Sequence, residues 1–441
     1  MSTAHAAKVE RLRGELGGAG RVALAKPTSN LFRDRAPAAA RRLEVRDFDA
    51  VLGFGPDWVE AEGMVTYAAL AEACLARGRM PAVVPQLKSI TLGGAAAGVG
   101  IEATSFREGL VHHSLREIEV LTGTGEIVVA APDNAHAGLF FGFPNSYGTL
   151  GYALRLRAKT LPVKEFVEVE HRRYAGARGF FEALAAACRG EADFVDGVVF
   201  DADCLVLNVA RFAERAPRTS DYRFERIYYK SLLERELDYL TARDYLWRWD
   251  TDWFWCSKNI GAQQPLLRRL YGRERLNSMF YAKVMRWNSR WGLTRALGAL
   301  SGWNSESVIQ DVDIPLPAAP EYLEFMHREI GLLPIWVCPI GDPNPAWRFP
   351  LYPTAPGTLY VNFGFWDVKK TRERHAPGHF NRLIERKVAE LGGIKSLYSD
   401  CYFTREEFAL AYGGAAYAAL KARYDPRGSF HDLYSKCVHR A

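Results

Sequence analysis

The sequence predicts an α+β protein with more than one domain. A chain of 441 residues exceeds what one simple hydrophobic core usually organises. Short strand and helix patterns follow one another without the regular strand–helix–strand alternation of a parallel sheet. The pattern changes near residue 165, and a glycine pair at 392–393 precedes a last helical part. We therefore expect a first domain over 1–165, a second over 166–395, and a C-terminal segment over 396–441 that returns to the first.

The first domain is expected to hold short strands around one clear helix. Leu43–Phe54 and Trp58–Glu62 have the composition of strands, and the turn pair Gly55–Pro56 separates them. Tyr67–Ala76 favours a helix, which Gly78 would end as its C-cap. Further strands are expected at 115–121 and 126–130, which would form a hairpin, and at 152–161.

The second domain is predicted to combine longer strands with helices. The pattern favours a strand at Phe166–Tyr174, an amphipathic helix at Gly179–Arg189 and a hairpin at Phe194–Ala210. Helical patterns dominate from about residue 228 to 297, and a strand returns at Tyr360–Phe365. Two more helices are expected, at 380–390 and 405–424.

The composition is that of an ordinary globular protein, with 48% hydrophobic and 24% charged residues. A net charge of +6 is compatible with an anionic ligand or an anionic membrane surface and requires neither. Nucleic-acid binding is not expected, because the sequence has no run of five basic residues and no zinc-finger or RNA-binding motif. The seven cysteines form no C-x-x-C pair, which is typical of reduced thiols in a cytoplasmic protein. We expect neither a signal peptide nor a membrane span.

Glycine gathers in the stretch Val84–Gly109, which holds five glycines and four alanines. Few bulky side chains lie between Leu92 and Ile101. Glycine costs conformational entropy, so such a cluster indicates backbone that turns at positive φ or lies directly against a ligand. A second loop of small residues occurs at Tyr147–Gly151, and a polar turn at Lys26–Asn30 follows a short strand at Val22–Leu24. Together these loops indicate a site for an extended, phosphorylated cofactor.

Two common nucleotide motifs do not explain the glycines. Gly98, Gly100 and Ala103 match G-x-G-x-x-A, but that motif needs a hydrophobic strand immediately before it and a helix after it. The preceding residues, 93–97, are glycine and alanine and make a poor strand. A phosphate-binding G-x-x-x-x-G-K-[ST] sequence is absent from the chain.

Three stretches instead resemble one known family. They read T-L-G-G-x5-G-I-E-x-x-S-F-R-x-G-L at 91–110, E-V-L-T-G-x-G-E-I-V at 119–128 and F-P-N-S-Y-G-T-L-G at 143–151. These residues are similar to the FAD-binding domain of the vanillyl-alcohol-oxidase superfamily, the PCMH type. Within it they resemble the delta-24-sterol reductase branch and bacterial relatives that act on methyl-branched fatty acyl chains. The resemblance continues through D-Y-L-W-R-W-D-T-D-W-F-W-C-S-K at 244–258 and through Tyr424–Lys436.

The resemblance implies FAD held between two α+β subdomains, with a cap domain over the flavin ring. Many superfamily members attach the flavin covalently through a histidine in the first loop or a cysteine near the second. This chain has neither residue in those loops, so non-covalent FAD is expected. The residues that the resemblance places against FAD are Thr28, Ser29, Asn30, Thr91, Gly93, Gly94, Gly98, Gly100, Glu102, Ser105, Ile127, Tyr147, Gly148 and Gly151.

Tryptophan is concentrated in the segment 245–255, in the predicted cap domain. Trp247, Trp249, Trp253 and Trp255 stand at odd positions, and charged residues stand between them. This period of two predicts an extended segment with one aromatic face. The face could belong to a core strand, to the wall of a site for a lipid chain, or to a membrane interface. Asn362, in the predicted strand at 360–366, is a candidate for the floor of the substrate site.

A flavin enzyme that forms or reduces a carbon–carbon double bond transfers hydride through the flavin N5. It also needs a proton donor or acceptor near the other carbon. We expect this group to be Tyr245, Asp250 or Glu306. Further candidates are Asp252, Asp311, Asp313 and His375. The pair at 112–113 is two histidines without an acidic or cysteine partner at ligand spacing, so no metal site is expected.

These observations lead to a hypothesis of an FAD-dependent oxidoreductase acting on the CH–CH group of a lipid. Its most specific form is reduction of a methylene-branched fatty acyl chain of a phospholipid, with NADPH as electron donor. Desaturation of a methyl-branched chain, reduction of a sterol side chain and lipid binding without catalysis are the alternatives. The expected partners are the lipid and a membrane surface, and a homodimer is compatible with the sequence. The expected location is the cytoplasm, with peripheral attachment at the inner face of the membrane left open.

Overall fold

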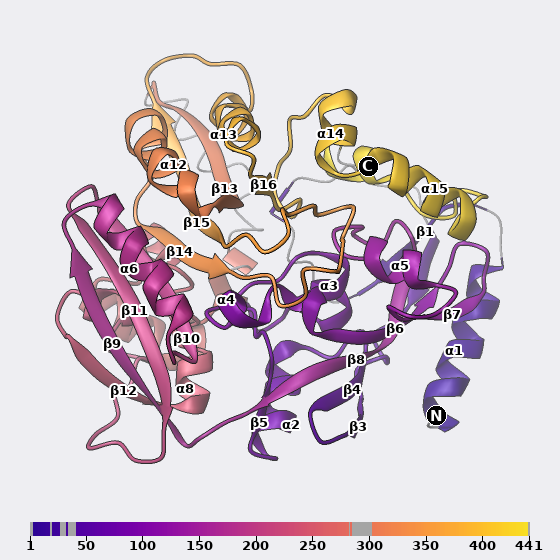
Figure 1. Ribbon diagram of the computed structural model, residues 1–441, viewed down its shortest axis with the longest axis horizontal. Helices are drawn as coiled ribbons and strands as arrows, with labels where there is room; N and C mark the ends of the chain where they lie inside the picture. The colour runs from indigo at the N-terminus through magenta and orange to yellow at the C-terminus, as the bar shows by residue number, and fades with distance from the viewer. Residues whose placement is uncertain are drawn as a thin grey trace.

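A computed structural model describes residues 3–17, 20–26, 32–33, 41–281, 283–284 and 302–439. The predicted cofactor residues Thr28, Ser29 and Asn30 lie outside this part of the chain. Two antiparallel sheets, each with its own helices, lie beside each other (Figure 1). The predicted α+β class is therefore confirmed. Domain boundaries at residues 165 and 395 remain our proposal.

The smaller of these sheets is built around one long strand, β8. Along β8 the side chains alternate between buried and half-buried, as the pleat of a strand requires. Arg155 and Arg157 share one face of β8 and pair with acidic residues of β4 and β6, including Glu60 at 2.9 and 2.8 Å. The strand order is β3 (Val51–Phe54), β4 (Trp58–Glu62), β8 (Tyr152–Pro162), β6 (Leu115–Leu121) and β7 (Ile127–Ala130), and β5 (Arg79–Pro81) pairs with the end of β8.

The larger sheet has eight antiparallel strands. Their order is β12 (Leu237–Thr241), β9 (Phe166–Tyr174), β11 (Cys204–Ala213), β10 (Phe194–Asp201), β14 (Ile335–Ile340), β15 (Tyr360–Thr371), β13 (Asn304–Pro315) and β16 (Ile394–Lys395). Helices α6 (Ala177–Arg189), α12 (Ala319–Phe325) and α13 (His379–Glu390) cover one face (Figure 1). In β14, Ile335 and Val337 point toward these helices, whereas Trp336 and Cys338 belong to the core shared with the smaller sheet. Period two along the strand thus gives the larger sheet two different faces.

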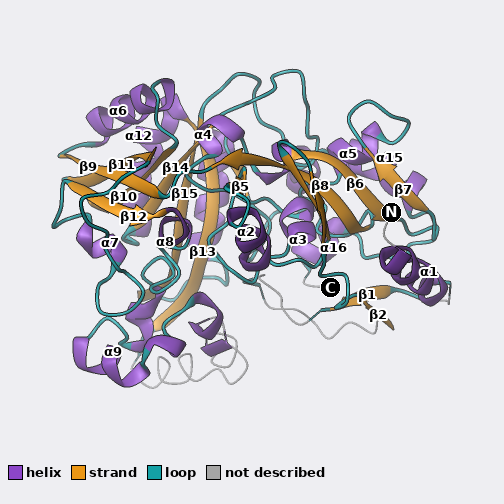
Figure 2. Cartoon of the chain, turned by 90° about the horizontal axis from the view of Figure 1, so that it is seen from below, coloured by secondary structure: helices purple, strands orange, loops and turns teal. Residues whose placement is uncertain are grey.

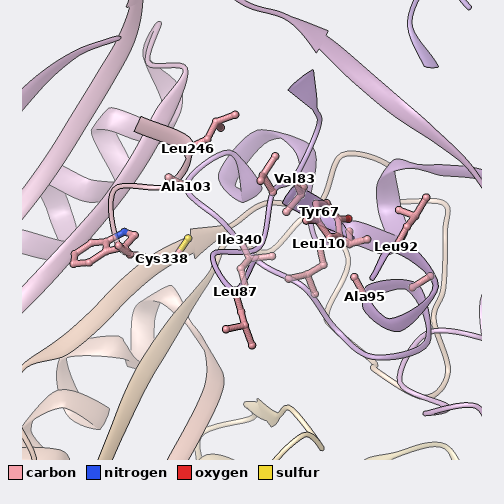
Figure 3. Close-up of a cluster of buried hydrophobic side chains, with 14 of the residues drawn as sticks. Tyr67, Val83, Leu87, Leu92, Ala95, Ala103, Leu110, Leu246, Cys338 and Ile340 are labelled. Atoms are coloured by element: carbon pink, nitrogen blue, oxygen red, sulfur yellow. The ribbon is translucent and has the colours of Figure 1, made fainter. Parts of the chain in front are cut away.

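A continuous hydrophobic core joins the two sheets. Figure 3 shows part of it, where Leu87, Ala103 and Leu110 lie near Cys338 and Ile340 of β14. The contributing helices near the smaller sheet are α2 (Tyr67–Leu75), α3 (Leu92–Ala97) and α5 (Ala137–Gly142). Phe106 of α4 (Ser105–Glu108) packs instead with the core between the larger sheet and its covering helices. Because the continuous core is shared by both sheets and closely packed, it fixes the positions of the two sheets relative to each other.

The C-terminal residues lie against the smaller sheet. Lys421 Nζ donates to the Thr149 carbonyl at 2.7 Å, and Lys436 Nζ donates to the Tyr147 carbonyl at 2.6 Å. The helices here are α14 (Arg405–Ala411), α15 (Gly414–Tyr424) and α16 (Leu433–Cys437). One helix was predicted across 405–424, and this was wrong. Gly413 has φ +58°, and a Cβ there would collide with the carbonyl of Pro350, so the chain turns at this residue.

The remaining described helices lie at the start of the chain, before β1, or beyond β11. They include α1 (Thr3–Leu16), α7 (Tyr228–Ser231), α8 (Ala242–Leu246) and α9 (Pro265–Tyr271). A helical run was predicted from residue 228, but β12 interrupts it by pairing with β9. The short parallel pair β1 (Val22–Ala25) and β2 (Arg41–Glu44) lies next to α1 (Figure 2).

A buried histidine attaches α1 to the smaller sheet. His5 Nδ1 lies 2.7 Å from Glu62 Oε1 on β4, and His5 Nε2 lies 2.8 Å from Glu119 Oε1 on β6. Burial alone would lower the pKa of His5, but the hydrogen bonds to Glu119 and Glu62 outweigh it and raise the pKa to about 9. Both ring nitrogens can donate only when the ring is protonated. The charged form of His5 therefore stabilises the folded protein.

We predict that stability falls as pH rises through about 9, because the folded pKa exceeds the ordinary value of 6.5. The contribution of His5 is fully present below pH 6.5. The His5→Ala variant should lose this pH dependence, and its free energy of unfolding should fall by about 1–3 kcal/mol. The loss is limited because Glu62 still pairs with Lys8 and Glu119 still pairs with Arg155. Urea unfolding between pH 6 and 9.5 measures both effects. His439→Ala, at an exposed residue, should behave as wild type, and an unchanged pH profile in His5→Ala would contradict the assignment.

Candidate active site

A cavity of about 440 Å³ opens between the two sheets. The smaller sheet contributes Tyr152 and Ala153 of β8 to the wall. The larger sheet contributes Asp311 of β13, Trp336 of β14 and Trp366 of β15. The glycine stretch and the C-terminal segment complete the lining. A concave site between two layers is where ligands commonly bind.

The glycine stretch forms a short helix, α3, along one wall. Thr91 precedes the helix, and its Oγ1 accepts the N–H of Gly94 at 3.1 Å. Gly93 packs directly on backbone, because a Cβ there would stand 2.8 Å from the carbonyl oxygen of Gly63. Gly93, Gly94 and Gly63 all line the cavity. Their lack of side chains lets two backbone segments meet and leaves the wall open to a flat or phosphorylated ligand.

The second loop of small residues lies against α3. The N–H of Tyr147 donates to the Ala97 carbonyl at 2.8 Å, and the N–H of Asn145 donates to the Gly98 carbonyl at 3.1 Å. Asn145, Tyr147 and Gly148 all have positive φ values, of 62°, 50° and 74°. Three such residues in one short loop indicate a backbone held by its surroundings. The two predicted loops are thus parts of one surface.

The structure places most of the predicted cofactor residues on the cavity wall. Those that line it are Thr91, Gly93, Gly94, Gly98, Gly100, Tyr147, Gly148 and Gly151. Three others lie elsewhere in the described chain. Ser105 Oγ accepts the N–H of Glu102 at 3.1 Å, Glu102 itself binds Arg248, and Ile127 packs near α1 and β1. A role for the wall residues in FAD binding is proposed from this placement.

Basic side chains that were not predicted as site residues also line the cavity. They are Lys26, Arg33, Arg42 and Lys436. Arg33 is buried, and its Nε and Nη2 have no hydrogen-bond partner among the described residues. A buried guanidinium with free donors fits a phosphate or another anionic group. No local motif marks Arg33 in the sequence, because β1, the second loop and the C-terminal segment come together only in the fold.

Aromatic side chains form another part of the wall. The rings of Phe254 and Trp366 lie 4.5 Å apart, and those of Phe254 and Trp336 lie 5.1 Å apart. Trp253 lies 5.4 Å from Phe32, and both line the cavity. These rings present an apolar surface of the kind that would accept a hydrocarbon chain.

The prediction of an extended tryptophan segment was wrong. Residues 247–255 form consecutive turns, and Trp253, Phe254 and Trp255 have φ values of 40°, 49° and 60°. Left-handed backbone at three successive bulky residues is unfavourable, and burial of their rings offsets the strain. The alternation in sequence therefore did not correspond to the two faces of a strand.

The four predicted substrate tryptophans consequently have different surroundings. Trp253 lines the cavity. Trp249 is buried and stacks on Phe254 at 4.7 Å, and Trp255 is buried with its ring 6.1 Å from that of Trp366. Trp247 lies outside the cavity, with Lys88 Nζ 5.4 Å from its ring centre. Trp253 is thus the member of this group that can touch a ligand directly in the described cavity.

Arg248 links the glycine stretch to the larger sheet through a buried network. Its Nη2 donates to Glu102 Oε1 and to Asp196 Oδ2, each at 2.7 Å. Gln86 Nε2 donates to Glu102, and Trp336 Nε1 donates to Asp196 at 3.2 Å. Burial would lower the pKa of Arg248, but Glu102 and the other anionic neighbours hold it well above its ordinary value. The guanidinium is therefore permanently charged and fixes the two walls relative to each other.

The three predicted catalytic residues are not among the described residues of the cavity wall. Tyr245 is buried under Arg248, whose guanidinium lies 4.2 Å from the tyrosine ring centre. Asp250 pairs with Lys88 at 2.8 Å. Glu306 accepts the N–H of Asn381 at 2.9 Å in the first turn of α13. Each of these side chains has a structural partner.

A different carboxyl group faces the cavity. Asp311 lies on β13 opposite Gly364 of β15, and a Cβ at Gly364 would stand 2.7 Å from Asp311 Oδ1. This Oδ1 has no hydrogen-bond partner among the described residues. Burial, and then the nearby Asp313, raise the pKa of Asp311 to about 7, against the lowering effect of hydrogen bonds from Tyr398 and Asn362. Asp311 is therefore a carboxyl that can hold a proton near neutral pH.

Polar side chains continue inward from Asp311. Asn362 Nδ2 donates to Asp313 Oδ1 at 2.7 Å, and the Tyr352 hydroxyl donates to Asp313 Oδ2 at 2.6 Å. Burial raises the pKa of Asp313 to about 6. Tyr398 lines the cavity, and its hydroxyl accepts the Nε1–H of Trp366 at 2.9 Å. Asn362 was predicted to contact substrate. In the structure it hydrogen-bonds to the carboxyl groups of Asp313 and Asp311.

The two adjacent histidines at 112–113 form an aromatic contact. Their rings stack at 4.5 Å, and His112 also meets Phe349 at 4.3 Å. Burial lowers the pKa of His113 to about 4. In the described ranges no group of three or more potential metal ligands occurs, and no helix is both long and apolar enough to cross a bilayer.

Comparison with known proteins gives one consistent result. A family model described as an FAD binding domain matches residues 38–131. The chain is 27% identical to Delta(24)-sterol reductase of Homo sapiens over 401 residues, which cover 87% of this chain and 74% of that protein. It is 25% identical to Delta(24)-sterol reductase of Arabidopsis thaliana over 445 residues, covering 90% and 77%. It is 30% identical to Cytokinin dehydrogenase 7 of Oryza sativa subsp. japonica over 171 residues. This alignment covers 38% of this chain and 32% of that protein.

The chain therefore carries an FAD-binding domain of the PCMH type and is similar over most of its length to delta-24-sterol reductases. It is an FAD-dependent oxidoreductase, as its motifs implied. The cavity fits this cofactor, because glycine backbone, aromatic rings and the two Arg33 nitrogens that lack a partner among the described residues would hold the flavin nucleotide. Lipid binding without catalysis is therefore not retained as an alternative.

We predict that the FAD is held without a covalent bond. The described lining residues include no cysteine, and His431 is the one histidine among them. Acid precipitation of the purified yellow protein should release the flavin fully into the supernatant, where its absorbance is measured. The His431→Ala variant should release the same fraction as wild type. Flavin that stays with the wild-type pellet but not with the variant's would contradict the prediction.

Proposed function

We propose that this flavoprotein reduces a carbon–carbon double bond in an apolar lipid chain. The observation that carries the proposal is a cavity in which a protonatable carboxyl, Asp311, lies with the aromatic group of Trp253, Phe254, Trp336 and Trp366. Alkene reduction needs a hydride donor, a proton donor and a dry apolar site. The FAD supplies the hydride when bound and reduced.

In this proposal the side chains divide the remaining work. Asp311 donates its proton from Oδ1 to the alkene carbon that does not receive hydride. Tyr398 and Asn362 hydrogen-bond to the Asp311 carboxyl and orient it. The aromatic rings hold the hydrocarbon chain and exclude water, which keeps the carboxyl protonated. NADPH is the proposed source of electrons.

The most specific substrate that we propose is a methylene-branched fatty acyl chain of a phospholipid. The aromatic wall accepts an apolar chain. Desaturation of a methyl-branched chain would use the same groups in reverse, with ionised Asp311 accepting the proton. Asp311, with its pKa near 7, is compatible with both directions.

Reduction of a sterol side chain is a second candidate. It is favoured by the relatives, since those from Homo sapiens and Arabidopsis thaliana are named Delta(24)-sterol reductases. Their identity to this chain, 27% and 25%, supports a shared type of reaction more strongly than a shared substrate. Both candidates require reduction of an alkene in an apolar chain.

The proposal predicts two half-reactions that can be observed separately. Under anaerobic conditions NADPH should bleach the flavin absorbance, and a phospholipid with a methylene-branched acyl chain should restore it. A sterol with a side-chain double bond is tested in parallel and identifies the second candidate. Reoxidation by neither lipid would overturn the reductase proposal, and a methyl-branched saturated chain that bleaches the flavin would indicate the desaturase.

Tryptophan variants provide a matched control in the same assay. Trp253→Ala removes a ring from the cavity wall and should raise the KM for lipid. Trp247→Ala removes a ring that contacts Lys88 outside the cavity and should leave that KM unchanged. The flavin spectrum should be normal in both variants.

We further predict that lipid-driven reoxidation falls as pH rises through about 7, because the protonated form of Asp311 is the donor. Asp311→Asn should slow reoxidation about 10²–10⁴-fold and remove this pH dependence. Bleaching by NADPH should be unchanged in the variant, since that step does not use the carboxyl. Stopped-flow absorbance at several pH values measures both steps. A pH profile that persists in Asp311→Asn would assign the proton to another group.

A further inference from the structure

Helix α9 carries a dense group of exposed aliphatic side chains. Leu266 and Leu270 are 74% and 72% exposed, and Leu267 is 43% exposed. Leu266 and Leu270 are one helical turn apart and lie on the same side of the helix. Large aliphatic residues usually reach the surface singly, so such a group marks a surface that contacts something apolar. Figure 2 shows α9 at the end of the molecule opposite α1.

The inner side of α9 is fixed to the rest of the protein. Arg268 is 2% exposed, and its Nη1 donates to Asp252 Oδ1 at 3.2 Å and to the Ala262 carbonyl at 3.0 Å. The Tyr271 hydroxyl donates to the Ile260 carbonyl at 3.0 Å. The leucines therefore cannot turn inward without breaking a buried ion pair. Asp252 directly precedes Trp253, so the helix is anchored beside a residue of the cavity wall.

Positive charge surrounds the exposed leucines. Arg269 lies on the helix, and Arg273 and Arg275 follow it directly; all three are exposed. Acidic residues nearby include Glu225, 3.3 Å from Arg269, Glu274, and Asp221, whose carboxyl interacts with Arg273. Exposed aliphatic side chains bordered by arginine are typical of helices that lie on anionic lipid surfaces. A second copy of this chain would bring the same arginines against one another, which is unfavourable.

We propose that α9 and the turn after it dock the protein on an anionic bilayer. Leu266 and Leu270 enter the layer of lipid headgroups, while Arg269, Arg273 and Arg275 meet the lipid phosphates. The inference deepens the proposed function and rests on it in one respect, since a lipid substrate resides in a bilayer. It brings the segment that carries Trp253, a residue of the cavity wall, close to that bilayer.

Vesicle sedimentation of the full-length protein tests the docking surface. Vesicles of phosphatidylcholine with phosphatidylglycerol should bind the protein more tightly than phosphatidylcholine alone, and added salt should weaken this binding. The double variant Leu266→Glu/Leu270→Glu should bind about tenfold more weakly or worse. Leu410→Glu is the matched control, because Leu410 is 87% exposed on α14, and it should bind as wild type. Arg273→Gln/Arg275→Gln should lose the preference for phosphatidylglycerol.

Each other outcome overturns the inference. Wild-type protein that ignores the vesicles, or an equal loss with Leu410→Glu, shows that α9 is not the docking surface. A wild-type dimer that dissociates in the leucine variant without any vesicle binding shows that a second copy covers α9. The sedimentation assay contains no NADPH and measures binding, not turnover. Its result is therefore independent of the reductase assay. A normal flavin spectrum in every variant confirms the fold.

Discussion

The buried charge of Arg248 is the constraint on which the site depends. It binds Glu102 from the glycine stretch and Asp196 from β10 at the same time. Removing one member of such a buried network leaves an uncompensated charge and costs about 3–5 kcal/mol. Gln86 and Trp336 bind this network and also line the cavity. The spacing of the two walls is therefore set by the same hydrogen bonds that neutralise the charge.

The aromatic turn continues directly from that network. Arg248 fixes its beginning, and the pair between Asp252 and Arg268 fixes its middle. These two anchors and the burial of the aromatic rings offset the cost of left-handed backbone at three successive residues, Trp253 to Trp255. The turn directs Trp253 and Phe254 toward the cavity and holds Trp249 and Trp255 in the core. One segment thus supplies both packing and an apolar wall.

The acid of the site depends on strand register. Asp311 and Asp313 are two residues apart on β13 and share a face, and opposite them on β15 stand Gly364 and Asn362. Glycine leaves room for one carboxyl, and the amide binds the other. A one-residue shift of β13 would turn both of its carboxyl groups to the face opposite Gly364 and Asn362. Burial raises the pKa of both carboxyl groups, and Asp313 raises that of Asp311 further, which suits proton transfer near neutral pH.

The sequence by itself determined the α+β class, most strands of the smaller sheet, the glycine-lined wall and the cofactor. These features depend on local pattern or on motifs, and both are readable along the chain. Only the tertiary structure decided that Tyr245, Asp250 and Glu306 are held by structural partners and that Trp253 alone of four tryptophans lines the described cavity. It also brought Arg33, Asp311 and Tyr398 to one site. Burial and partners decide the role of such side chains, and both arise from residues distant in sequence.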